Sequence, residues 1–480
     1  MPISDNHSSS NSHEKYGLKS TLAQTLAVVV QNCISIEWGM AIVTPSIVLT
    51  DLFQNSSSSF SISLIEASWY VSLLHFTHLF GALLSGTLQK QLGRKRCMII
   101  ANLPSFIGWI LLYLSHSSTV LCLSNSMVGF GIGFSSIAKY SYTGEITEPR
   151  LRGRLASLTG VSIMIGVSLI FVLESLFHWR SIALASVCFL IIRTCLISMI
   201  PESPIWLIAH GKNDKAEKAL CWLRGWMEPE TVKYEFLELI RHNKPTNDQE
   251  STVDTEIKGG GLFAEIAQFK NPSAYRPLIL VIIYLIVSLI SCFTPFTMQI
   301  IVNVGFAIYP NTYMIVFTVL QGLGSMVLML TINCLGKRYL TLLTISVNTT
   351  LIFMLGVYIK TLKHNYVTSS PWIPFTIISS IYFSGSCGIY YIPWILLSEV
   401  FPYRIRGIAT GLCTGISGVI LLVLIKSYIS IESALTLEYT MFLFSFISFI
   451  GFIYFYYYLP ETENKTLLEI EKHFESSSKR

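Results

Sequence analysis

Charge is scarce in this sequence. Only 13% of the 480 residues are Asp, Glu, Lys or Arg, whereas 52% are hydrophobic and the mean hydropathy is +0.56. A soluble domain carries about 25% charged residues. A chain with half that share has too little polar surface to cover a water-soluble body, which excludes a large soluble enzyme.

Patterns that support catalysis or cofactor binding are also missing. The ten cysteines show no paired spacing, so we interpret them as packing residues rather than disulfides or metal ligands. No metal-ligand spacing, nucleophile elbow or phosphate loop occurs, and the glycine-rich stretch at 129–133 follows no strand. Those glycines predict close helix packing instead. We therefore expect no enzymatic activity, no cofactor and no metal, and the small net charge of +5 does not indicate nucleic acid binding.

Long apolar runs recur along the whole chain. A helix of about 20 apolar residues crosses a hydrocarbon layer roughly 30 Å thick, and only a helix satisfies its own backbone in lipid. The predicted fold class is therefore an all-α membrane protein embedded in a lipid bilayer. The sequence predicts twelve transmembrane helices, at 22–49, 66–88, 97–115, 119–143, 155–177, 180–200, 276–302, 311–334, 339–360, 372–398, 408–430 and 437–459.

A polar stretch divides these helices into two sets of six, and the short loops predict their orientation. Eleven Lys and Arg residues lie in loops on one side and four on the other, which places the first side, with both termini, in the cytosol. The loop after the first helix is then extracellular, and Asn55 within it is a glycosylation acceptor. The expected segments are a disordered cytosolic tail at 1–20, a six-helix bundle at 21–200, a cytosolic linker with short helices at 201–275, a second bundle at 276–459 and a cytosolic tail at 460–480.

The two halves repeat three motifs in the same order and at the same helix ends. The pairs are Gly93-Arg94-Lys95 with Gly336-Lys337-Arg338, Glu145…Arg152-Gly153 with Glu399…Arg406-Gly407, and Pro201-Glu202-Ser203 with Pro460-Glu461-Thr462. Such a repeat predicts two pseudo-symmetric six-helix bundles that rock about a substrate held between them.

The charged residues of these motifs predict a latch. Acidic and basic groups at neighbouring helix ends can pair when the cytosolic side is closed, and must separate when it opens. The alternative is that the charges anchor helices at the lipid headgroups. The predicted latch residues are Arg94, Lys95, Glu145, Arg152, Glu202, Lys337, Arg338, Glu399, Arg406 and Glu461.

The repeated motifs resemble those of the sugar porter family of the major facilitator superfamily. Three longer stretches resemble the same family: PESPIWL at 201–207, SEVFPYRIRG at 398–407 and PETENKTLLEIEKHF at 460–474. Within it, the chain is most similar to the insect facilitated trehalose transporters. The resemblance implies a plasma-membrane carrier that moves trehalose or a hexose by alternating access, facilitatively and as a monomer. Two other hypotheses stay open: a carrier of a less hydroxylated solute and a non-transporting sugar sensor.

The resemblance also implies where the solute binds, and this chain departs from the family there. Ser288, Leu289 and Thr294 stand where hexose carriers place helix 7 amides, and Gly160 stands at the helix 5 glutamine. Trp394 follows Pro393, whose missing backbone donor can loosen the helix. A broken helix beside this aromatic residue suits stacking on a sugar ring, unless Trp394 is an ordinary interior tryptophan. Gln321 is a candidate amide, or else a helix–helix contact. The candidate substrate-binding residues are Gln321, Trp394, Ser288, Ser291, Thr294, Gln299, Ser386 and Ser417.

Glu37, Lys139 and Arg193 are ionisable residues that fall inside predicted spans. Glu37 is the acid well inside the first span, so it is neutral, paired or exposed to water, and it is the candidate for proton coupling. Lys139 and Arg193 lie within reach of the cytosolic interface, and we expect both to snorkel to it.

Overall fold

The computed structural model describes residues 17–54, 60–243, 269, 271–292, 310–363, 372–402 and 405–476. These residues form helices joined by short turns, and no strand occurs among them, so the predicted all-α class is confirmed. The predicted glycosylation site at Asn55 and the candidates Thr294 and Gln299 lie outside the described residues, as does most of the tail predicted at 1–20.

Eleven helices within the described part of the chain are long and apolar enough to cross a membrane, and each overlaps a predicted span. Two of them are the halves of one continuous element, α19, which bends at Thr436 where φ is 64°. The elements are α1 (Gly17–Gln54), α2 (Leu64–Leu92), α3 with α4 (Arg94–Ile100 and Asn102–Tyr113), α5 (Ser118–Ile146), α6 (Pro149–Leu176), α7 (Trp179–Met199), α13 (Pro272–Cys292), α15 (Pro310–Leu335), α16 (Lys337–Lys363) and α19 (Arg406–Tyr458).

The tenth predicted span, at 372–398, is not one continuous helix. It consists of α17 (Trp372–Ser386) and the short α18 (Ile392–Leu396), separated by turns at 387–391. Pro393 lies in the first turn of α18, where its missing N–H leaves no helical hydrogen bond unmade. The break that the sequence predicts at Pro393 therefore occurs, but it lies just before this residue, at 387–391.

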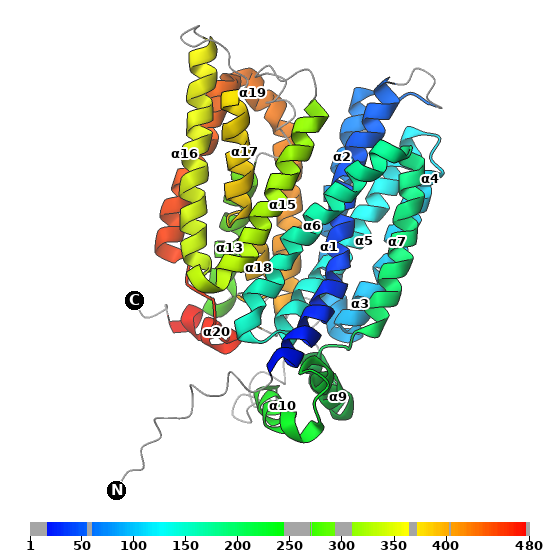
Figure 1. Cartoon of the computed structure of the whole chain (residues 1–480), viewed down its shortest axis with the longest axis vertical. Helices are drawn as coiled ribbons and strands as arrows, with labels where there is room; N and C mark the ends of the chain where they lie inside the picture. The colour runs from blue at the N-terminus through cyan, green and yellow to red at the C-terminus, as the bar shows by residue number, and fades with distance from the viewer. Residues whose placement is uncertain are drawn as a thin grey trace.

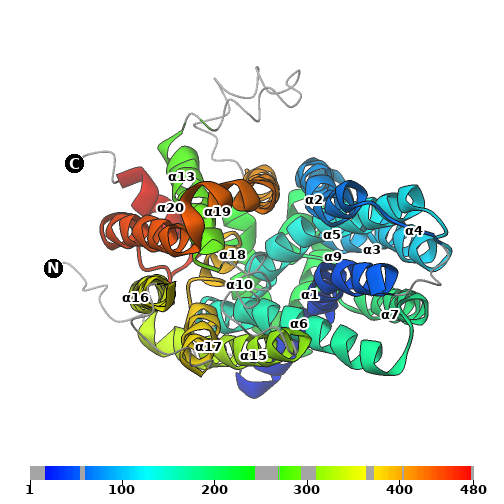
Figure 2. The ribbon, with the colours of Figure 1, turned by 90° about the horizontal axis from the view of Figure 1, so that it is seen from above.

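The helices form two groups that lie side by side (Figure 2). Two hydrophobic cores lie among the helices from α1 to α9 (Asn213–Leu223), and a third lies among α13 to α19. A fourth, centred on α13, α16, α18 and α19, also includes Ala156 of α6. Between the groups, α2 packs on α19 and α6 packs on α15. At Gly86 and Gly407 the backbones come so close that a Cβ on Gly86 would lie 2.8 Å from the Gly407 carbonyl oxygen. Only glycine permits this approach between the groups.

Short helices gather at one end of the two bundles, below the long helices in Figure 1. Three of them lie between α7 and α13, and one follows α19. We call this the tail end, because α1 begins here. The short helices are α8 (Pro204–Ala209), α9 (Asn213–Leu223), α10 (Pro229–Asn243) and α20 (Leu467–Ser476).

Candidate functional site: a central cavity closed at the tail end

A cavity of about 510 Å³ lies between the two bundles. Its walls come from α1, α2, α5 and α6 of the first bundle and from α13, α15, α18 and α19 of the second. Pockets that bind small molecules measure about 300–1,000 Å³. The cavity therefore has room for a small solute, and both bundles contact whatever occupies it.

The cavity extends away from the tail end. Along α1 its lining runs from Ile34 to Thr50, and α1 begins at the tail end. Along α19 it runs from Thr414 to Ile425, again on the far side of the helix start at Arg406. The cavity therefore faces the end opposite the tails.

Four of the predicted substrate-binding residues line this cavity: Ser288, Gln321, Trp394 and Ser417. The Trp394 ring stacks on Tyr140 of α5, with centroids 6.2 Å apart and planes inclined by 20°. This aromatic pair joins the two bundles, because α5 belongs to the first and α18 to the second. An aromatic face open to a cavity is a surface on which a sugar ring can stack.

Ser291 and Ser386 do not line the cavity. The Ser291 hydroxyl bonds that of Ser448 at 2.8 Å, which joins α13 to the second half of α19. The Ser386 hydroxyl donates to the Tyr382 carbonyl at 2.7 Å within α17. Both side chains are fully buried, so these two candidates serve helix packing rather than solute contact.

The cavity wall is mainly aromatic, aliphatic and hydroxyl-bearing. Gln321 is the one amide side chain among the described residues that line it. Hydroxyls come from both bundles, for example Ser35, Thr159 and Thr318. The wall thus offers stacking surfaces and single hydrogen bonds rather than a set of paired amides.

Three basic side chains in the wall were missed by the sequence reasoning: Lys139, His75 and His78. Lys139 is only 3% exposed, so the prediction that it snorkels to the interface was wrong. Its ammonium group donates to the Ser35 hydroxyl at 2.7 Å. Helical spacing could have indicated that the Lys139 side chain points into the cavity. Ser136, Lys139 and Tyr140 are spaced i, i+3 and i+4, so they share one face of α5, and all three line the cavity.

Glu37 lies inside the first bundle and does not line the cavity. Its carboxylate forms an ion pair with Arg193 of α7 and accepts a hydrogen bond from the Trp109 indole at 3.3 Å. Arg193 is fully buried and also donates to the Asn102 side chain. Of the three states considered for Glu37, the structure has the paired one, and the prediction that Arg193 snorkels was wrong.

The repeated motifs occupy equivalent places at the tail end of both bundles. Glu202 accepts hydrogen bonds from the backbone N–H groups of Arg94 and Lys95, at 3.0 and 3.1 Å. Glu461 accepts from those of Lys337 and Arg338, at 3.1 and 3.0 Å. Each carboxylate thereby caps the start of a helix, where the orphan N–H groups favour negative charge.

One latch contact joins the bundles through Glu145 of α5. Its carboxylate pairs with Arg94 at 2.7 Å within the first bundle and lies 4.0 Å from Arg406 of the second. All three side chains are buried. The Arg94–Glu145 pair has its counterpart in Lys337 and Glu399, which lie 2.8 Å apart in the second bundle.

Glu463, which was not among the predicted latch residues, lies next to one of them, Lys337. Its carboxylate lies 2.7 Å from the Lys337 ammonium group, and a Cβ on Gly153 of α6 would meet it at 2.5 Å. Arg152 interacts electrostatically with both Glu399 and Glu463. Burial raises the pKa of the Glu463 carboxyl above its ordinary value, and the charge of Lys337 opposes that rise. In the sequence, Glu463 could have been selected because it follows the motif residue Glu461 by two positions.

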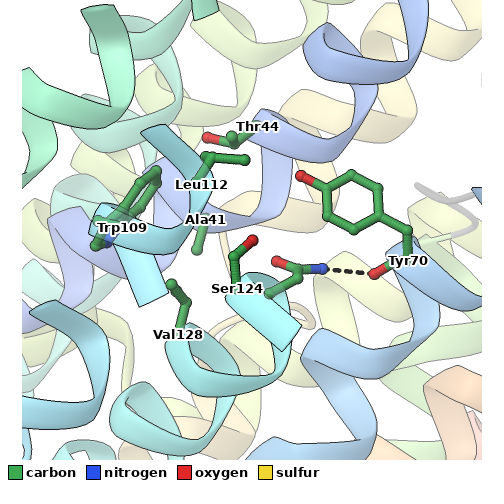
Figure 3. Close-up of a pocket in the computed structure, with 8 residues that line it drawn as sticks. Ala41, Thr44, Tyr70, Trp109, Leu112, Ser124 and Val128 are labelled. Carbon is green, nitrogen blue, oxygen red and sulfur yellow. Dashed lines mark hydrogen bonds between the residues drawn. The ribbon is translucent and has the colours of Figure 1, made fainter. Parts of the chain in front are cut away.

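A second, much smaller cavity of about 10 Å³ lies within the first bundle (Figure 3). Tyr70, Trp109 and Ser124 are among the side chains around it. Asn125 donates a hydrogen bond from its side chain to the Tyr70 carbonyl at 2.6 Å, which ties α5 to α2. A space of this size holds at most about one water molecule, so it cannot serve as the solute site.

Comparisons with known proteins agree with this architecture. The profile of the family described as "Sugar (and other) transporter" matches residues 12–474. A facilitated trehalose transporter of Apis mellifera ligustica is 25% identical over 94% of this chain and 88% of its own length. One of Bombyx mori is 26% identical over 86% and 80%, respectively.

Among solved structures, a proton:xylose symporter of the major facilitator superfamily bound to 6-bromo-6-deoxy-D-glucose has a TM-score of 0.78. It is 16% identical and covers 95% of this chain and 100% of its own. The match is to the fold, and it agrees with two pseudo-symmetric helix bundles around a central cavity. This chain is therefore a multi-pass membrane carrier that belongs to the sugar (and other) transporter family.

Proposed function

We propose that the protein carries a saccharide, trehalose or a hexose, across the plasma membrane by alternating access. The observation that carries this proposal is a cavity of about 510 Å³ whose wall combines the Tyr140–Trp394 stack with hydroxyls from both bundles. The tail end is the cytosolic side in this proposal, so the cavity faces outward. The trehalose transporters among the relatives support the same substrate class.

We further propose that transport is facilitative. The acid suggested for proton coupling, Glu37, is held in an ion pair with Arg193 away from the cavity. Coupling requires a group that gains and loses protons as the carrier cycles, and an ion-paired carboxylate remote from the solute is poorly placed for that role.

Uptake by purified protein in proteoliposomes tests the proposal. Labelled trehalose and glucose should each be offered, and saturable, stereospecific flux is expected for at least one of them. Trp394→Ala should raise KM by about tenfold, because the ring-stacking surface is lost, while Trp394→Phe should raise it less. Ser291→Ala, outside the cavity, should leave KM unchanged. Absence of saturable flux for both sugars, from protein that elutes as a folded species, would rule the proposal out.

A carrier of a less hydroxylated solute is the second candidate. It is favoured by the single amide, Gln321, among the described lining residues. A polyhydroxylated ligand loses many hydrogen bonds to water, and unpaired groups in a buried site lower its affinity. A counterflow screen of polyols, sugars and small organic acids separates the two candidates. Preference for a solute with few hydroxyls would favour the second.

A further inference from the structure

Lys139 brings a cation to the cavity wall in the middle of α5. Its side chain is buried, and its ammonium group donates to the Ser35 hydroxyl at 2.7 Å and lies 4.4 Å from the centroid of the Tyr140 ring. No carboxylate among the described residues forms an ion pair with it. It differs in this respect from Arg94, Arg193 and Lys337, which all have acidic partners.

An ammonium group at this depth is costly unless an opposite charge accompanies it. Ionisable residues inside membrane helices face a partner or a water-filled cavity, and they mark solute pathways. One hydroxyl and one aromatic face offset only part of the desolvation of a cation. The cavity itself is the remaining source of a counter-charge, and it is where the solute binds.

The rest of the described wall adds no charge that opposes an anionic ligand. His75 and His78 of α2 line the cavity and contact the Trp38 ring, with centroids 5.9 and 5.0 Å from it. The described lining residues include no Asp and no Glu. An anionic group on the solute meets no like charge there.

The aromatic pair places a ring site next to this cation. Tyr140 follows Lys139 on α5, and its ring contacts both the ammonium group and, at 6.2 Å between centroids, the Trp394 ring. A solute that stacks near Trp394 can therefore direct an acidic substituent toward Lys139. A carboxylate matches a single ammonium group, whereas phosphate sites are commonly built from several donors in a fixed geometry.

We propose that the transported saccharides include a sugar acid, whose carboxylate pairs with Lys139 while its ring lies near Tyr140 and Trp394. This inference rests on the proposed carriage of saccharides and adds to it the charge of the solute. The Ser35 hydroxyl accepts from Lys139 and donates to the Asn32 side chain at 3.2 Å, which holds the ammonium group in place when the solute arrives.

Transport of glucuronate and glucose by the same proteoliposomes tests the inference, since the two differ by one carboxylate. Glucuronate should exchange faster than glucose at equal concentration. An inside-positive membrane potential, set with potassium and valinomycin, should accelerate glucuronate uptake, because a net negative charge then crosses with each cycle. Glucose uptake by a facilitative carrier should not respond to that potential in the same way.

Lys139→Met removes the charge and keeps the length of the side chain. It should lower the ratio of glucuronate to glucose transport by about tenfold or more, the loss expected when a charged hydrogen-bond partner is removed. Lys139→Arg keeps the positive charge, so its ratio of glucuronate to glucose transport should stay close to that of the wild type. Lys363→Met is the control, because Lys363 lies outside the cavity, where it pairs with Glu438 at 2.8 Å. In this variant the ratio of glucuronate to glucose transport should equal that of the wild type.

Thermal unfolding gives a second measurement that does not need transport. Glucuronate should raise the Tm of the wild type and leave that of Lys139→Met unmoved. Without ligand, Lys139→Met should unfold at a higher temperature, because a buried unpaired charge has been removed. This measurement distinguishes loss of the anion site from loss of the fold.

Two outcomes would overturn the inference. In the first, the wild type transports glucose but neither binds nor exchanges glucuronate, which leaves saccharide carriage intact. In the second, Lys139→Met retains the wild-type ratio of glucuronate to glucose. If neither sugar is transported but glucuronate still raises the wild-type Tm through Lys139, saccharide carriage fails while the anion site stands.

Discussion

The carboxylate of Glu145 lies 4.0 Å from the guanidinium group of Arg406, and this contact joins the first bundle to the second. Glu145 also forms an ion pair with Arg94 at 2.7 Å. One buried carboxylate therefore contacts a basic residue of its own bundle and a basic residue of the other bundle. Of these two contacts, only the pair with Arg406 must break when the tail ends separate. It is therefore the contact whose removal should alter the conformational equilibrium.

Arg406→Gln should shift the protein toward a state that is open at the tail end. Losing a buried inter-bundle charge should change the ratio of the two states by about tenfold. Pulsed electron resonance between spin labels at Arg150 and Asn464, both exposed at the tail end, measures the change as a new, longer distance. Arg338→Gln is the control, because Arg338 binds within its own bundle, to the Tyr456 carbonyl. Equal distance distributions in the two variants would contradict a latch.

Glu463 should make stability depend on pH with a defined sign. Burial raises the pKa of this carboxyl, so above about pH 4.3 the folded protein retains a proton that the unfolded chain has lost. The free energy of unfolding of the wild type relative to Glu463→Gln should fall as pH rises through the raised pKa, by at most about 1.4 kcal/mol per pH unit. Thermal unfolding in detergent from pH 4.5 to pH 8 measures it. Glu475→Gln, at an exposed position in α20, should show no comparable trend.

Glu37→Gln should act on stability rather than on coupling. It leaves Arg193 buried without its acidic partner, which typically costs about 3–5 kcal/mol. The variant should therefore unfold at a lower temperature, and the double variant Glu37→Leu with Arg193→Met should recover much of the loss. Uptake with and without a pH gradient should fall in the same proportion. Selective loss of gradient-driven accumulation at an unchanged Tm would instead identify Glu37 as a proton carrier.

The repeated glycines of the tail end should tolerate no side chain. Gly93 and Gly336 have φ values of 94° and 78°, and a Cβ on either would lie 2.4 Å from the carboxylate of Glu202 or Glu461. Gly93→Ala and Gly336→Ala should each combine backbone strain of about 1–2 kcal/mol with displacement of the capping carboxylate. Gly211→Ala is matched in backbone conformation, with φ of 68° and nothing within 4 Å, so it isolates the strain. The first two variants should lower Tm more than the third.

Most of the fold could be predicted from the sequence, because span length and the duplicated loop motifs depend on local chemistry. Eleven predicted spans match long helices, and the repeated Glu202 and Glu461 occupy equivalent caps. The break before Pro393 was misplaced, because the apolar run at 372–398 continues through the turns that interrupt the helix. Hydropathy registers the depth of a residue in the membrane and not the continuity of its backbone.

The candidate site could be predicted only in part. Trp394 and Gln321 line the cavity, whereas Ser291 and Ser386 point into helix contacts. Lys139 and Arg193 received the same interpretation from their depth alone, yet one lies in the cavity wall and the other pairs with Glu37. The direction in which a side chain points depends on helix rotation and on partners distant in sequence, which one sequence without tertiary contacts does not specify.

The cavity extends from the middle of the bundles toward the end opposite the tails, so the two faces of the molecule differ for an added compound. A glycoside with a bulky, impermeant substituent could enter from the face opposite the tails and lodge between Trp38 and Trp394 without permitting closure. The same compound supplied from the tail face would meet a sealed surface of buried charges. Orientation in a vesicle would thus determine whether such a compound is an inhibitor or inert.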